Sequence, residues 1–327
     1  MPKLLSIIIP TLNRPRELEK TLTSIAANYP IDSDYVEFIL CDNASSPPAN
    51  PSETTISLFK GNLRIVRFDN LVQIDQSFAR CINQAQGKYI QIFGDDDIAI
   101  GNLGFKVLQT LAQNPNTSIL YLNRLIGNDL LSNISEIAHP NDCAKGIFSL
   151  PISDFITNYN HWPSFIPSII FSSESWKKGF KLSQQRYPGY NFLDIILRGS
   201  LPSPVILMGD PLLIQRRGIQ SWKKYWPQYW LQAFPEILKN FDLEGITKDS
   251  LSTWICNEIK IKNFIVDLLI ARSLPSIYKR IFWQDVASTF NSSKLSLITN
   301  CIRILPPSIA RLILSTSPNS RKYNLND

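Results

Sequence analysis

Four short apolar runs in the first hundred residues constrain the fold of this chain most strongly. They are rich in β-branched residues, as expected of strands buried on both faces of a sheet: LLSIIIP (4–10), YVEFILCD (35–42), LRIVRF (63–68) and KYIQIF (88–93). Residues 14–28 and 75–87 have the apolar spacing of helices, with Pro15 suited to a first turn and Asp75 a candidate cap. The alternation predicts an α/β domain with a mostly parallel central sheet flanked by helices.

Polar residues follow the end of each predicted strand. They are Thr11, Asn13 and Arg14 after the first, Asp42 and Asn43 after the second, Arg67 at the third, and Asp95, Asp96 and Asp97 after the fourth. Because ligands of parallel α/β sheets bind beyond the carboxyl ends of the strands, we expect these side chains to share one binding rim. The sequence has no GxGxxG after the first strand and no GxxxxGK[ST], so it predicts neither a dinucleotide fingerprint nor a P-loop.

The three adjacent aspartates of FGDDD (93–97) crowd like charges together, which is costly unless a positive charge lies among them. Carboxylate oxygens at a strand end suit a hard cation such as Mg²⁺, Mn²⁺ or Ca²⁺, with a neighbouring carboxylate left for a sugar hydroxyl. The alternative is a solvated turn in which Asp95 or Asp97 caps the next helix.

Two other carboxylates also have two interpretations each. Asp42, with Asn43, could accept hydrogen bonds from a nucleobase or a ribose hydroxyl, or it could start an Asx-turn. Asp194 lies in NFLD on a predicted helix, where an apolar neighbourhood would suit a general base. The alternative for Asp194 is an ordinary exposed helix position.

The region beyond residue 217 differs in pattern and charge. Helical patterns occur at 221–240, 250–272, 276–290 and 294–314, and residues 216–327 carry 16 basic and 8 acidic side chains against 17 and 19 in residues 1–215. A basic region favours a phosphate-bearing or anionic partner, or it is a solvated basic face. The stretch SWKKYWPQYW (221–230) is an interfacial membrane contact, a sugar-stacking platform or a packed helix face.

Cysteine usage and hydropathy bear on location. Five dispersed cysteines without a CxxC pair, and only two histidines, argue against the usual zinc site and favour a reducing compartment. The apolar run near residue 4 is too short to predict a signal peptide, and no window offers about 18 uncharged apolar residues. We therefore expect a cytoplasmic protein.

In order, LSIIIPTLNRPRELEKTLTSI, FILCDNASS, RIVRFDN and QGKYIQIFGDDDI resemble the family-two glycosyltransferases of the GT-A fold, in the branch with abequosyltransferase-type enzymes. The resemblance is good over about residues 1–105 and extends more weakly to about 217. It implies a Rossmann-like GT-A domain whose nucleotide-sugar-binding half is 1–105 and whose acceptor-binding half is 106–217. A helical C-terminal region, 218–327, would follow.

The resemblance also implies roles for individual residues. Nucleotide-sugar binding would fall to Pro10, Thr11, Asn13, Arg14, Asp42, Asn43, Arg67, Asp75 and Asp95. Asp96 and Asp97 would hold Mn²⁺ or Mg²⁺, and Asp194 would be the catalytic base. Gly94 stands where the commoner LDSDD motif has its first aspartate.

The implied activity is metal-dependent, inverting transfer of one hexosyl or deoxyhexosyl group from a nucleotide-diphosphate sugar to an acceptor hydroxyl, in cell-surface polysaccharide or glycan synthesis. The acceptor would be a glycan or a lipid-linked oligosaccharide, and transfer would stop at one sugar because the QxxRW motif of processive synthases is missing. We expect no nucleic acid partner, and peripheral contact with the inner face of a membrane through the basic C-terminal region. The alternatives are a non-catalytic nucleotide-sugar-binding protein and, less favoured because PTLNRPRELEK lacks glycine, a nucleotidyltransferase.

Overall fold

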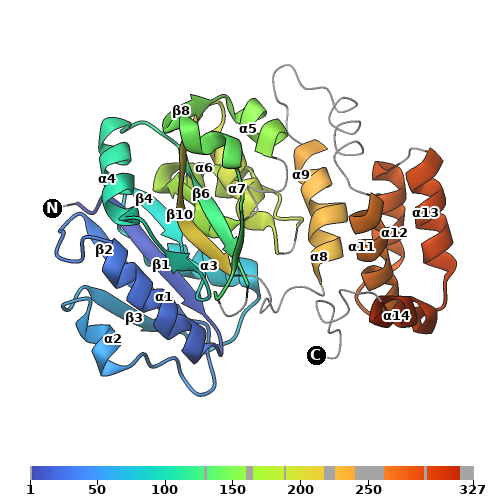
Figure 1. The fold of residues 1–327 in the computed structure, drawn as a ribbon, viewed down its shortest axis with the longest axis horizontal. Helices are drawn as coiled ribbons and strands as arrows, with labels where there is room; N and C mark the ends of the chain where they lie inside the picture. The colour runs from blue at the N-terminus through green and yellow to red at the C-terminus, as the bar shows by residue number, and fades with distance from the viewer. Residues whose placement is uncertain are drawn as a thin grey trace. The chain divides into compact units, whose positions relative to one another are not determined.

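The chain divides into two compact units, Met1–Arg217 and Gly218–Asp327, and each is described here by itself (Figure 1). The computed structural model describes residues 2–128, 131–159, 165–187, 189–216, 225–239, 261–290 and 293–316. Residues 221–224, with Trp222, lie outside the described residues, as does the part of the helix expected at 250–272 that precedes residue 261. The expected division of the first unit at residue 105 stays a prediction.

The described part of the first unit is built on one ten-stranded sheet of order β3-β2-β1-β4-β9-β6-β10-β5, with β7 beside β6 and β8 beside β10. The strands are β1 Leu5–Thr11, β2 Val36–Asp42, β3 Leu63–Arg67, β4 Tyr89–Ile92, β5 Ile98–Ala99, β6 Ile119–Gly127, β7 Ile134–Ile137, β8 Ile147–Leu150, β9 Ile169–Ser172 and β10 Val205–Arg216. The four strands predicted from the first hundred residues are all present and run parallel, which confirms the α/β prediction. In the second half β6 and β10 are parallel, while β9 runs antiparallel to both β4 and β6.

Helices cover both faces of this sheet. They are α1 Pro15–Asn28, α2 Glu53–Ser57, α3 Ile74–Ile82, α4 Leu103–Gln113, α5 Ile152–Tyr159, α6 Ser173–Leu182 and α7 Asn191–Ser200, with 3₁₀ turns at Pro140–Lys145 and Ile166–Ser168. Because β2 and β4 flank β1, right-handed crossovers put α1 and α3 on opposite faces. The helix contacts agree: α1 packs on α4, whereas α3 packs on α7, which in turn packs on α6 (Figure 1).

Local sequence explains most of these elements. The strands β1 and β2 are buried almost throughout, and Leu18, Leu22 and Ile25 of α1 form part of the core as their spacing predicts. The expected cap of α3 is wrong: the helix begins after Gln73, and Asp75 lies inside its first turn. Its carboxylate is engaged elsewhere in the unit, and so does not cap the helix.

Helices α6 and α7 touch backbone to backbone through two glycines. A Cβ on Gly179 would lie 1.8 Å from the carbonyl oxygen of Ile195, and one on Gly199 would lie 1.7 Å from that of Ser175. No side chain fits at either position, so the two helices are held in one register. This contact fixes the position of α7, which carries Asp194.

The described part of the second unit is helical, as expected. Its elements are α8 Trp226–Gln228, a π-helical turn Tyr229–Ala233, α9 Phe234–Lys239, α11 Ile261–Ser273, α12 Arg280–Thr289, α13 Ser293–Ile304 and α14 Pro307–Thr316. The single helix expected at 294–314 is wrong, because the backbone breaks at Pro306 and turns by 111°. Of the described helices, none alone is long and apolar enough to cross a membrane, although α13 and α14 taken together would be.

Candidate functional site

Three predicted site residues lie side by side on neighbouring strands at the carboxyl edge of the sheet. In the strand register Thr11 pairs with Asp42, and Asp42 pairs with Arg67. Pro10 lies one step back along β1, opposite Cys41. The strand ends therefore meet at one rim, as the sequence predicts.

Arg14 supplies the positive charge among the three adjacent aspartates. Its Nη1 atom lies 3.2 Å from Asp95 Oδ1 and 2.7 Å from Asp96 Oδ2, and Thr11 Oγ1 donates to Asp95 Oδ2 at 2.7 Å. Burial raises the pKa of Asp95 to about 6, and the Arg14 guanidinium opposes that rise. The first and fourth strands are thus tied together by an ion-paired cluster.

Asp97 is more deeply buried than its two neighbours. Its Oδ1 atom accepts a hydrogen bond from the backbone N–H of Arg216 at 3.1 Å, and its backbone carbonyl accepts one from Thr21. Burial raises the pKa of Asp97 well above its usual range and the charge of Asp96 adds to this rise, while the buried Arg124 opposes it. Asp97 therefore connects the acidic turn to the end of β10.

The carboxylates of Asp96 and Asp97 converge above the backbone of Gly94. A Cβ on Gly94 would lie 2.6 Å from Asp97 Oδ2 and 3.1 Å from Asp96 Oδ1. Among the described residues, no three Asp, Glu, His or Cys side chains come together closely enough to hold a metal. A cation here would have two carboxylates from the protein and would need its other ligands from phosphate and water, which is how Mg²⁺ is often bound. The residues fit a divalent cation of that kind.

The loop after β2 is organised by Asp42. Its two oxygens accept the backbone N–H groups of Ser45 at 2.8 Å and Ala49 at 2.9 Å, so the turn-forming interpretation of Asp42 holds. Asn13 lies against the same loop: its N–H donates to Ser45 Oγ at 3.0 Å, and its Oδ1 accepts from Ser46 N–H at 2.8 Å. Asn13 has a φ of 55°, a left-handed conformation that asparagine tolerates better than most residues.

Asn43 and Arg67 are both hydrogen bonded to neighbouring groups on this rim. Asn43 Nδ2 donates to the carbonyl of Val72 at 3.0 Å, and its Oδ1 accepts from Arg80. Arg67 donates to the carbonyl of Ala49 at 3.3 Å, which ties β3 to the loop after β2. Ser45 and Arg80 were not singled out from the sequence, because their partners are set by loop folding and helix placement.

Asp75 and Asp194 lie on the α3–α7 side of the unit. Asp75 Oδ2 accepts hydrogen bonds from Gly189 N–H and from Asn191 Nδ2, its Oδ1 is buried with no hydrogen-bond partner among the described residues, and burial raises its pKa. Asp194 is wholly buried, 2.8 Å from Arg198 and hydrogen bonded to Ser183 Oγ. The exposed-position alternative for Asp194 is therefore wrong, and its role as a base stays a prediction.

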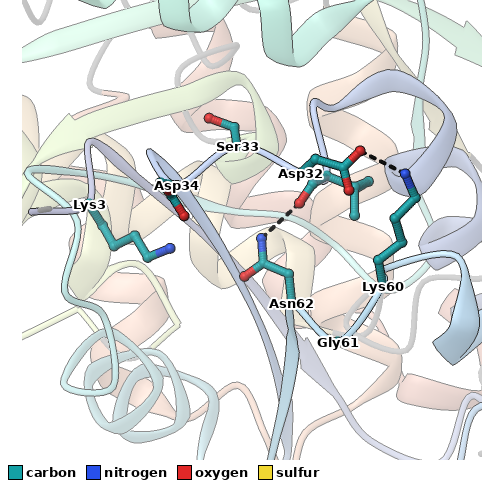
Figure 2. Close-up of a pocket in the computed structure, with 8 residues that line it drawn as sticks. Lys3, Asp32, Ser33, Asp34, Lys60, Gly61 and Asn62 are labelled. Atoms are coloured by element: carbon teal, nitrogen blue, oxygen red, sulfur yellow. Dashed lines mark hydrogen bonds and ion pairs between the residues drawn. The ribbon is translucent and has the colours of Figure 1, made fainter.

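A separate polar pocket lies away from the rim (Figure 2). It is lined by Lys3, Ile31, Asp32, Ser33, Asp34, Lys60, Gly61 and Asn62, with an ion pair of 2.7 Å between Lys60 and Asp32. These residues precede β1, β2 and β3, so the pocket is at the amino ends of the parallel strands and contains none of the candidate site residues. Ligands of such sheets bind at the opposite edge.

Comparison with known proteins gives the family. The model of the family described as Glycosyl transferase family 2 matches residues 6–169. The chain belongs to glycosyl transferase family 2. Abequosyltransferase RfbV of Salmonella typhimurium (strain LT2) is 32% identical over 141 residues, which span 42% of this chain and 40% of that relative. The chain therefore matches less than half the length of this curated relative.

Solved structures of S. aureus TarS share the fold. The structure of TarS 1–349 has a TM-score of 0.56 at 11% identity, with 91% of each chain covered. The complex of TarS 1–349 with UDP has a TM-score of 0.58 at 12% identity and covers 95% of this chain and 90% of that one. The complex with UDP-GlcNAc has a TM-score of 0.57 at 11% identity. With the family match, this similarity confirms the GT-A fold and the C-terminal helices.

Proposed function

We propose that this protein transfers one hexosyl or deoxyhexosyl group from a nucleotide-diphosphate sugar to an acceptor hydroxyl, with inversion and with a divalent cation. The observation that carries the proposal is the cluster of Thr11, Arg14, Asp95 and Asp96 at the carboxyl edge of β1 and β4. It lies in a family 2 chain, and TarS, which has the same fold, has been solved with UDP and with UDP-GlcNAc.

The nucleotide would bind along the rim formed by the ends of β1, β2 and β3. The loop after β2, held by Asp42, Asn13 and Arg67, presents backbone and side-chain polar groups there. Asp95, which already accepts a hydrogen bond from the Thr11 hydroxyl, is suited to accept one from a ribose hydroxyl. Arg14 places a positive charge beside Asp96, next to the position proposed for the diphosphate.

Asp96 and Asp97 would hold Mn²⁺ or Mg²⁺, because their carboxylates converge over Gly94. The chemistry such a cation supplies is neutralisation of the charge that develops on the departing nucleoside diphosphate. Arg216 keeps Asp97 in place through its backbone N–H, and Arg14 orients Asp96. Both contacts prepare the carboxylates before the donor binds.

For the proton of the acceptor hydroxyl we propose Asp194 as the base, with direct displacement at the anomeric carbon. Its carboxylate would first have to be released from Arg198 and Ser183. D194N should then abolish transfer while donor binding stays near the wild-type value. It should also lower the melting temperature, because it removes the buried carboxylate that pairs with Arg198, so turnover is compared at a temperature at which circular dichroism shows the variant to be folded. If folded D194N keeps its turnover and D75N alone removes it, Asp75, with its buried and unpartnered oxygen, is the base.

We propose a glycan or lipid-linked oligosaccharide as the acceptor, in cell-surface polysaccharide or glycan synthesis in the cytoplasm. The supporting observations are the similarity to an abequosyltransferase and the free thiols of the described cysteines, Cys41, Cys81, Cys143 and Cys301, which suit a reducing compartment.

The decisive experiment begins with a thermal-shift screen of nucleotide sugars in the presence of Mn²⁺. The donor that stabilises the protein is then incubated with and without Mn²⁺, and the released nucleotide is measured. Release of nucleoside diphosphate that needs the cation, and that D96A abolishes, supports glycosyl transfer. Binding without release would indicate a non-catalytic binder, and pyrophosphate formation from a nucleoside triphosphate would indicate a nucleotidyltransferase.

A further inference from the structure

Helix α13 of the C-terminal unit has one buried row and one exposed apolar row. Leu295 and Ile302 face the interior of the unit, whereas Leu297 is 65% exposed and Ile304 is 79% exposed. Leu297 and Ile304 are seven residues apart, so they lie on the same side of the helix. Nothing in the described part of the chain covers that side.

Helix α14 repeats this arrangement. Ala310 and Leu314 are buried, while Leu312 is 63% exposed and Ile309 and Ile313 are each 43% exposed. The three exposed residues are spaced by three and four, which is one face of a helix. The break between α13 and α14 is only two residues long, so both apolar rows belong to one continuous segment. We call Leu297, Ile304, Ile309, Leu312 and Ile313 the α13–α14 surface.

The charged residues within this segment are all of one sign. Residues 293–316 contain Lys294, Arg303 and Arg311 and no aspartate or glutamate. Arg311 donates to the carbonyl of Ser273 at 3.1 and 3.2 Å, which fastens α14 to the C-terminal end of α11. Lys294 and Arg303 are exposed, and Lys294 begins the row that continues through Leu297.

The geometry argues for a segment that lies along a bilayer surface. The two helices together are as apolar as a membrane span, but they bend by 111° at their junction. Ile304, the most exposed large apolar side chain among the described residues, comes directly before this bend. An amphipathic segment with cations along its edge lies in the interface, with its apolar side chains among the acyl chains and its cations at the headgroups.

We propose that the α13–α14 surface docks on an anionic lipid bilayer. A second copy of the chain fits less well, because a symmetric contact through this face would bring the cations of both copies, Lys294 and Arg303, into one interface with no acidic side chain from either segment. Anionic headgroups complement both cations. This docking does not depend on the proposed sugar transfer, although it would bring the protein close to acceptors carried by lipids.

Flotation of the full chain with lipid vesicles tests the proposal. The wild-type protein should float with phosphatidylcholine vesicles that contain phosphatidylglycerol and stay behind with phosphatidylcholine alone, at physiological salt. L297S/L312S should lower the bound fraction about tenfold or more, and K294E/R303E should do the same on the anionic vesicles. F105S is the matched control, since Phe105 on α4 is 64% exposed and belongs to the other unit.

The proposal is overturned if neutral and anionic vesicles bind equally, or if the two double variants bind like the wild type. Light scattering tests the alternative occupant, a second copy of the chain. A dimer that L297S/L312S abolishes, in a protein that does not float with either vesicle, would assign the surface to a second copy. Melting temperatures of the variants establish that each is folded, and the charge variant provides an independent answer if the serine variant is not.

Discussion

Replacing Gly94 by alanine tests whether Asp96 and Asp97 are organised by their convergence over the residue 94 backbone. The new methyl group would lie 2.6 Å from Asp97 Oδ2, closer than real Cβ contacts come. The Asp97 carboxylate cannot move aside freely, because its residue is 4% exposed and its Oδ1 accepts the Arg216 N–H. Overpacking costs about 1–3 kcal/mol, and a buried donor left unpaired costs about 1–3 kcal/mol.

We therefore expect G94A to lower the free energy of unfolding by about 2 kcal/mol, which corresponds to a fall in melting temperature of about 4–8 °C for a unit of this size. Urea unfolding followed by circular dichroism measures the first quantity. The same variant should also weaken Mn²⁺ binding in calorimetry, because the displaced Asp97 can no longer face the cation with Asp96.

A double-mutant cycle with D97A separates this explanation from a general effect of alanine at residue 94. In D97A the oxygen that the methyl group would strike is gone, so adding G94A should cost less than about 1 kcal/mol. The coupling energy between the two substitutions should then exceed about 1 kcal/mol. Additive effects, or a G94A protein that unfolds and binds Mn²⁺ like the wild type, would refute the reasoning.

Three further predictions concern other parts of the chain. G179A should lower the free energy of unfolding by more than about 3 kcal/mol or prevent folding, because its methyl group would strike a backbone carbonyl of α7. K177A, on the exposed side of the same helix, should change it by less than about 0.5 kcal/mol. Equal melting temperatures of the two variants would contradict this prediction. Burial raises the pKa of Asp267 to about 8, above the unfolded value of about 3.9, so the stability that this group contributes below about pH 4 is lost as the pH rises towards 8, by up to about 5 kcal/mol. Calorimetry should find a smaller loss of stability over this pH range in D267N than in the wild type, and equal losses would contradict the prediction. Mn²⁺ and the nucleoside diphosphate of the bound donor should each tighten binding of the other by more than about fivefold, and titration calorimetry of R14M should find this coupling reduced; independent binding in the wild type would exclude it.

Much of the parallel half of the sheet could be predicted from local pattern. A strand buried on both faces has to be apolar throughout, so β1 and β2 can be recognised in the sequence. Because ligands of such sheets bind beyond the carboxyl ends of the strands, the position of the rim follows. The position of β9 between β4 and β6 could not be predicted, since this pairing joins residues about 80 positions apart and runs antiparallel. The backbone contact of α6 and α7 could be predicted only in part, because a glycine inside a helix indicates close packing but does not identify the helix that it packs against.

The candidate site, too, could be predicted only in part from the sequence. The residue types on the rim follow from the sequence, but their partners do not, because Asp42 closes its own loop and Asn43 meets Arg80 only after α3 has packed. Asp194 could be assigned to a helix but not to its interior, since burial of a carboxylate depends on Arg198 one turn later and on Ser183 from another element.

Arg14 is the site residue whose contacts differ most from those expected. The sequence predicts a side chain that faces a ligand, whereas in the structure its guanidinium bridges Asp95 and Asp96. A diphosphate would compete with these carboxylates for Arg14, and a divalent cation would compete with Arg14 for Asp96. When both arrive as one complex, each lost ion pair is replaced by another, whereas either alone leaves a partly buried charge less well paired. Arg14 therefore supplies the positive charge beside Asp95 and Asp96, and in the proposed mechanism the same arginine would couple binding of the cation to binding of the diphosphate.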